Sequence, residues 1–115
     1  MATMANNILF SIDSMLQMKG GTNVANVPDH ITMGYDACPY QILNNNSGGA
    51  LDVKLPGEAA TTPVKSGLMY FFRNTGAHNL QLKKEGGASL GAAIGTDKIA
   101  IVVSAAGAWH LLFQD

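Results

Sequence analysis

Gly67-Leu-Met-Tyr-Phe-Phe-Arg-Asn-Thr-Gly76, together with the later Gly107-Ala-Trp-His-Leu-Leu-Phe113, decides the fold predicted for this chain. The first stretch is rich in aromatic residues, which strands favour, and it ends in an Asn-Thr-Gly turn signal. In the second stretch, Trp109, Leu111 and Phe113 alternate onto one face. The chain from Gly67 to Phe113 has four strand-like apolar runs, each closed by turn residues. It therefore predicts a series of short strands.

The alternation continues outside this stretch. In Leu51-Asp-Val-Lys-Leu55 the three apolar residues point one way and the charged pair the other, as in a half-buried strand. Further strands are predicted over residues 68–73, 79–83, 98–103 and 108–113, with a weak one over 89–94. Short strands at about ten-residue spacing, without helices between them, are typical of sandwiches and barrels. We expect one all-β domain over residues 1–115: an antiparallel β-sandwich or small barrel with a β core at 50–115 and an extended N-terminal arm.

The region before this core is expected to be irregular. Residues 21–40 contain Pro28 and Pro39, and proline lacks a backbone donor and restricts the residue before it. We therefore expect loops here and no long central strand. Gln41-Ile-Leu43 is short, and Asn44-Asn-Asn-Ser-Gly-Gly49 is a strong turn signal.

The N-terminal residues are predicted to form an arm. Residues 1–7 are small and polar, and Ile8-Leu-Phe-Ser-Ile-Asp-Ser-Met-Leu-Gln-Met18 fits helical and strand periods equally. Residues 1–18 are either a docking segment, since methionine adapts to irregular surfaces, or an amphipathic element that closes one end of the core. The candidate docking residues are Ile8, Leu9, Phe10 and Met15.

Composition bounds the function classes. Of the 115 residues, 47% are hydrophobic and 13% are charged, and the net charge is −1. The chain therefore has no electrostatic footprint for nucleic acid and no basic tract for an anionic membrane. A surface with so little charge suggests cover by other subunits; a small, plain domain rich in alanine and glycine is the alternative. The single cysteine, Cys38, and the lack of a signal peptide or apolar span predict a soluble chain made in the cytoplasm.

Catalytic chemistry is not predicted. The glycine-rich run Gly86–Gly95 lacks the lysine of a phosphate loop, and the spacing of His30, Asp36 and Cys38 is no zinc signature. Unpaired Glu58 and Glu85 do not predict glycoside hydrolysis. Hydrolytic residue types are present but form no motif: Ser66, Ser89, Ser104, His78, His110, Asp97 and Asp115. We expect no enzyme, no cofactor and no metal.

The aromatic residues leave two interpretations. Tyr70, Phe71, Phe72 and Trp109 could form an exposed platform for sugar. Alternation along the strand instead sends some of them into the core, and both faces of this strand are apolar. We favour a strand with one face at a subunit interface, and assign Met69, Phe71 and Trp109 to that interface or to the core.

The order of these stretches resembles small β-domains of tailed-bacteriophage virion proteins. The pattern is a strand ending in Leu55-Pro, a Gly-led aromatic strand from Gly67 ending in Asn-x-Gly, the run Leu80-Gln-Leu82, the strand from Lys98, and a closing strand at Gly107-Ala-Trp109. It covers about Leu51 to Asp115 and is shared by capsid decoration (cement) proteins and tail-fibre modules. The resemblance implies a small, usually trimeric protein that pins neighbouring major-capsid subunits, with residues 1 to about 18 as the contact arm.

The sequence thus predicts a non-enzymatic capsid decoration protein of the virion. It would bind the outer capsid surface as a homotrimer, with the major capsid protein as partner and neither nucleic acid nor membrane involved. The alternative is a tail-fibre or receptor- and glycan-binding β-module, whose partner is a host surface.

Overall fold

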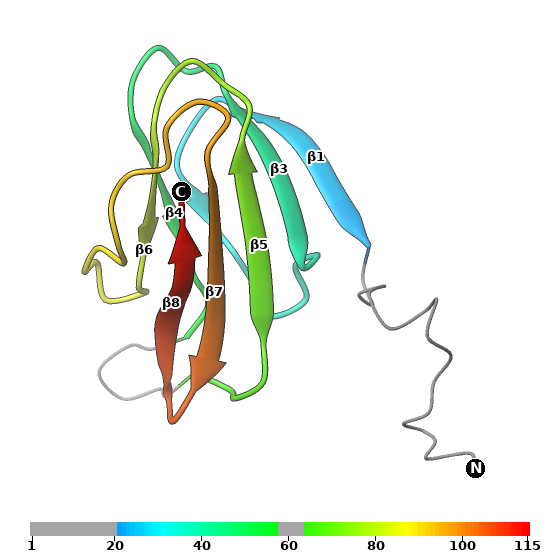
Figure 1. Ribbon diagram of the computed structural model, residues 1–115, viewed down its shortest axis with the longest axis vertical. Helices are drawn as coiled ribbons and strands as arrows, with labels where there is room; N and C mark the ends of the chain where they lie inside the picture. Colours follow the sequence, from blue (N-terminus) through cyan, green and yellow to red (C-terminus); the bar gives the residue numbers. More distant parts are fainter. Residues whose placement is uncertain (1–20, 58–63) are drawn as a thin grey trace.

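The protein folds as two β-sheets around one core (Figure 1). The computed structural model describes residues 21–57 and 64–115. About 49% of the described residues have strand structure, and these residues contain no helix, hence none that could cross a membrane. The expected arm at residues 1–18 lies outside the described residues. The all-β prediction is confirmed; the sheets do not close into a barrel, so that alternative is wrong.

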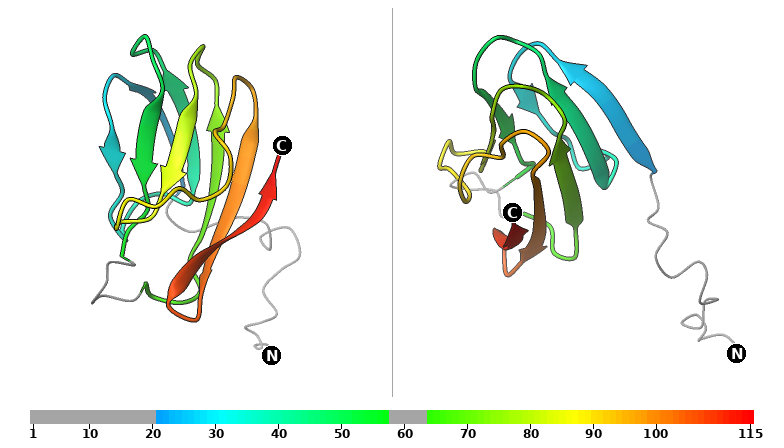
Figure 2. Two further views of the ribbon diagram at one scale, coloured as in Figure 1. Left: turned by 90° about the vertical axis from the view of Figure 1, so that its left-hand side faces the viewer. Right: turned by 45° about the horizontal axis from the view of Figure 1, so that its top comes forward.

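The large sheet has the strand order β1-β3-β5-β7-β8, and the small sheet has the order β2-β4-β6. The large sheet comprises β1 (Thr22–Val27), β3 (Tyr40–Asn45), β5 (Met69–Asn74), β7 (Ile99–Ala105) and β8 (Ala108–Gln114). The small sheet comprises β2 (Ile31–Thr32), β4 (Leu51–Lys54) and β6 (Leu80–Lys83). The small sheet lies in front of the large one in the left view of Figure 2.

The chain winds between the sheets in three successive coils. β1 leads to β2, β3 to β4, and β5 to β6, so each coil adds one parallel strand to each sheet. Only β5–β7 and β7–β8 pair antiparallel among the named strands. The predicted antiparallel arrangement is therefore wrong for most of the molecule. Short alternating strands look alike in either arrangement, because alternation records which face is buried and not the direction of the neighbour.

Strands also begin earlier than expected. The predicted loop region contains β1 and β2, and β3 has six residues and lies inside the large sheet. Pro28 lies between β1 and β2 and Pro39 lies directly before β3. Both prolines thus interrupt the chain where it changes sheets, which is where the missing backbone donor is tolerated.

The core lies between the two sheets and follows the predicted alternation. The inner face of β5 supplies Tyr70 and Phe72, which are 3% and 2% exposed. Leu51 and Val53 of β4 and Leu80 and Leu82 of β6 cover them from the small sheet. Burial of these apolar faces on both sides is the main stabilising term of the fold.

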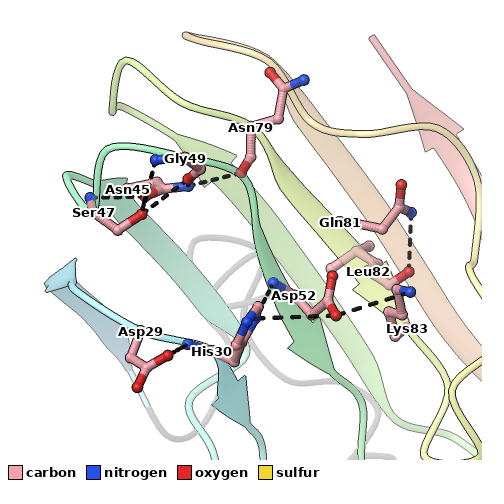
Figure 3. Close-up of polar contacts among 10 residues, drawn as sticks. All are labelled: Asp29, His30, Asn45, Ser47, Gly49, Asp52, Asn79, Gln81, Leu82 and Lys83. Carbon is pink, nitrogen blue, oxygen red and sulfur yellow. Dashed lines mark hydrogen bonds and ion pairs between the residues drawn. The ribbon is translucent and has the colours of Figure 1, made fainter.

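A buried asparagine ends β3 and another ends β5, where the chain leaves the large sheet. The Asn74 side-chain amide donates to the carbonyls of His78 and Ile94, at 2.7 and 2.9 Å, and its oxygen accepts the Gly76 N–H at 2.9 Å. Asn45 makes the equivalent set with Asn79, Gly49 and Ser47 (Figure 3). Each side chain therefore satisfies buried backbone groups at a crossing between the sheets.

Gly76 follows the second crossing and permits a close approach. A Cβ at this position would overlap the backbone of Asn45, so the two crossings pack directly against each other. Any residue other than glycine would force them apart.

Candidate interaction surface

The outer side of the large sheet is apolar across three adjacent strands. Because alternate residues of a strand point to opposite faces, the neighbours of the buried positions point outward. They are half-buried rather than fully exposed. We call this set the outer apolar face: Tyr40 and Ile42 of β3, Met69 and Phe71 of β5, and Ile99, Ile101 and Val103 of β7.

The strand register aligns these side chains into rows. Tyr40 lies opposite Phe71, and Phe71 lies opposite Ile101. The rings of Tyr40 and Phe71 are 5.0 Å apart between centroids and tilted by 30°. Ile101 in turn lies opposite Phe113 of β8, which is 49% exposed. One apolar row therefore runs over four strands and ends in a solvent-exposed phenylalanine.

The second row runs from β3 through β5 to β7 and contains Arg73, the one charged side chain of the two rows. Ile42 lies opposite Arg73, and Arg73 lies opposite Ile99. Arg73 forms an exposed ion pair with Asp97, with 3.3 Å between Nη2 and Oδ1. The pair neutralises the guanidinium at the rim, so the outer apolar face carries no uncompensated charge.

A groove crosses the outer apolar face. It has a volume of about 310 Å³ and is lined mainly by the side chains of the two rows, with Thr22 of β1 at one side. The wall is almost entirely apolar, so it offers contact area with few hydrogen-bonding groups. Such a surface suits another apolar surface better than a polar small molecule.

The structure separates the three residues predicted for an interface or core. Trp109 is 2% exposed, and its Nε1 donates to the Pro56 carbonyl at 2.9 Å, so it belongs to the core. Met69 and Phe71 belong to the outer apolar face. Of the predicted docking residues, Ile8, Leu9, Phe10 and Met15 lie outside the described residues.

The alternative of an exposed sugar platform made of four aromatic side chains is not what the structure shows. Tyr70 lies 5.4 Å from Trp109 and 6.2 Å from Phe72 between ring centroids, and all three are buried. Burial raises the pKa of the Tyr70 hydroxyl, with smaller contributions from Asp36 and Tyr35. Only Phe71 of the four faces outward, where its aromatic partner is Tyr40.

Three of the remaining candidate side chains, those of Ser104, His30 and His110, have structural partners. The Ser104 hydroxyl is buried and accepts the Leu68 N–H at 2.9 Å. His30 Nδ1 accepts the Asp52 N–H at 2.9 Å, and the His110 ring contacts the Ala105 carbonyl at 3.1 Å. No group of three or more metal-ligating side chains gathers within residues 21–57 and 64–115.

The sequence indicated the two asparagines of the crossings only as turn residues, although a signal for their shared buried role exists. Asn45 precedes Leu51-Asp-Val-Lys54, and Asn74 precedes Leu80-Gln-Leu-Lys83 at the same spacing, 29 residues later in the chain. Such an internal repeat is typical of coiled, repetitive β architecture.

Comparison of the chain with protein-family models, curated proteins and solved structures found no match. The functional argument therefore rests on the surface itself.

Proposed function

We propose that this protein is a non-enzymatic structural protein of a virion, a decoration protein that binds the outer surface of a capsid as an oligomer. The observation that supports this is the outer apolar face: an uncharged sheet surface of this kind is unfavourable in water and favourable in an assembly. The fold is classed in this proposal as a β-sandwich with an N-terminal contact arm. The oligomer is a homotrimer, as the resemblance implies.

The proposed mechanism is linkage. A protein that binds the assembled shell but not its loosened form stabilises the assembled shell in proportion to the occupancy of its sites. Because an oligomer contacts several neighbouring subunits at once, modest affinity for each is sufficient. In this proposal the outer apolar face joins the decoration subunits, and Ile8, Leu9, Phe10 and Met15 contact the major capsid protein.

The test is cosedimentation of the protein with empty capsids assembled from the major capsid protein of the same virus. We expect saturable binding, and an increase in the temperature at which the empty shells dissociate. Phe10→Asp should weaken binding at least tenfold, whereas Asn6→Asp, a polar position of the same segment, should not. Absence of binding to intact shells would refute the proposal.

A host-binding module of a tail fibre is the second candidate. The outward aromatic pair Tyr40–Phe71, with Arg73 beside it, is a feature that glycan-binding surfaces share. Adsorption of the labelled protein to host cells, competed by surface glycans and abolished by Tyr40→Ala, would favour this candidate over decoration.

A further inference from the structure

The stack of coils has one protected end. Beyond β5 the large sheet is extended by β7 and β8. Beyond β6, the following segment covers the edge of the small sheet: Leu80 and Ile94 exchange backbone hydrogen bonds, and Leu90 N–H donates to the Leu82 carbonyl at 2.9 Å. The backbone groups of β6 are thereby paired on both sides.

The other end of the stack is bare within the described residues. There β1 is the edge of the large sheet and β2 is the edge of the small sheet. Natural edge strands are usually shielded by charge, proline or a bulge. The sequence of β1, Thr22-Asn-Val-Ala-Asn-Val27, contains no charged residue and no proline. Its register with β3 is continuous, so the strand has no bulge either. Val24 at its centre is 72% exposed.

The interior is also accessible at this end. A groove of about 380 Å³ opens between β1 and β2, and its apolar lining includes Ala25, Val27, Ile31 and Met33. In repetitive folds, a bare terminal coil is normally capped or stacked on a neighbour. Here the groove and the free edge occur together, so one partner could cover both.

We propose that the partner is a second copy of this chain, and that the two β1 strands pair antiparallel about a two-fold axis through Val24. An axis perpendicular to the large sheet keeps the outer faces of both copies on the same side. It sets Val24 opposite Val24 of the second copy and Thr22 opposite Asn26 of the second copy. On the outer face apolar thus meets apolar and polar meets polar, whereas on the inner face Asn23 lies opposite Ala25 of the second copy. No charged side chains oppose each other.

The joint makes the two large sheets continuous and brings the two end grooves together across the axis. It uses the edge of the sheet and not the outer apolar face, so it is independent of the proposed capsid function. One edge strand of six residues contributes far less than a standard interface. We therefore expect concentration-dependent association that links two chains, or two oligomers already formed through the outer apolar face.

Disulfide trapping tests the register. In a Cys38→Ser background, Val24→Cys places two sulfurs across the axis, within the reach of a disulfide. Asn26→Cys is the matched control on the same face of the strand. Its equivalent in the second copy lies about 13 Å away along the strand, beyond that reach. We expect a cross-linked dimer for Val24→Cys and little or none for Asn26→Cys after mild oxidation.

Charge at the axis tests the energetics. Val24→Lys opposes two like charges and should weaken association measured by sedimentation at least tenfold. Leu112→Lys, on the opposite edge strand β8 and 59% exposed, is the control and should leave this step unchanged. Trp109 fluorescence checks that each variant is folded.

Three outcomes would overturn the proposal: wild-type protein that does not associate through this edge at any concentration, equal cross-linking of both cysteine variants, or unchanged association of Val24→Lys. A fourth is hydrogen exchange in which the β1 amides are equally protected in dilute and concentrated protein. That result would show the edge to be covered within one chain.

Discussion

The solvent sides of the two sheets differ although each of the three coils contributes one strand to both sheets. The small sheet presents Thr32, Asp52, Lys54, Gln81 and Lys83, an ordinary polar surface. Asp52 lies within 4.0 Å of His30 Nδ1 and 3.9 Å of Lys83 Nζ (Figure 3). The large sheet instead presents the outer apolar face. Because folding requires only the inner faces to be apolar, the second apolar face is the observation on which the proposed association rests.

The largest expected effect is on the free energy of unfolding, and it distinguishes the inner face of β5 from its outer face. Phe72→Ala removes a side chain that is 2% exposed and should lower the free energy of unfolding by about 3–5 kcal/mol. Phe71→Ala, one residue earlier on the outer apolar face, should cost about 1 kcal/mol, the value of a cross-strand pair. Urea unfolding of both variants measures the difference. Equal losses would mean that the outer apolar face is part of the folding core.

The second-largest effect is expected at the crossings between the sheets, where a buried asparagine ends the strand. Asn74→Asp replaces an amide donor by a carboxylate that faces the carbonyls of His78 and Ile94 in a buried site. Loss of two hydrogen bonds and burial of charge should cost about 3 kcal/mol at neutral pH, and less in acid, where the carboxyl is protonated.

Asn46→Asp is the control for that crossing, because Asn46 is adjacent to the equivalent Asn45 but exposed. It should change stability by no more than about 0.5 kcal/mol. If Asn74→Asp were equally mild in thermal and urea unfolding, the buried amide would not be what holds the crossing.

For the small sheet, the sequence was sufficient to predict which side is buried and which faces solvent. Alternation in Leu51–Lys54 and Leu80–Lys83 predicted a buried and a polar side, and the structure agrees. It could not give the direction of the neighbouring strand, because parallel partners such as β3 and β5 are joined through a strand of the other sheet. Nor could it divide Met69 and Phe71 from Tyr70 and Phe72, since both sets are apolar and only the position of the small sheet decides which is inside.

A charge added to the large sheet should weaken association, whereas the same charge added to the small sheet should not. Phe71→Lys places an ammonium in the middle of the apolar row and should weaken self-association by at least tenfold, or about 1.4 kcal/mol. Gln81→Lys adds the same charge to the small sheet, where Gln81 is half-buried among polar residues, and should have no such effect. Sedimentation equilibrium over a concentration series measures both, and equal responses would remove the distinction between the two sides.

The smallest effect is expected on the small sheet itself. Asp52→Asn keeps the shape but removes the charge between His30 and Lys83, and leaves Lys54 and Lys83 opposite each other without a counter-charge. Because the Asp52 side chain is 37% exposed, water screens these pairs, and the loss should be about 0.2–1 kcal/mol at low salt and smaller at high salt.

Asp97→Asn is the matched control, because it breaks the exposed pair with Arg73 at the rim of the outer apolar face. It should lower the free energy of unfolding by a similar amount. The two variants should differ only in association, where Asp97→Asn leaves Arg73 uncompensated beside the apolar rows and Asp52→Asn changes nothing. A loss above about 2 kcal/mol for Asp52→Asn would instead make the polar side of the small sheet a determinant of folding.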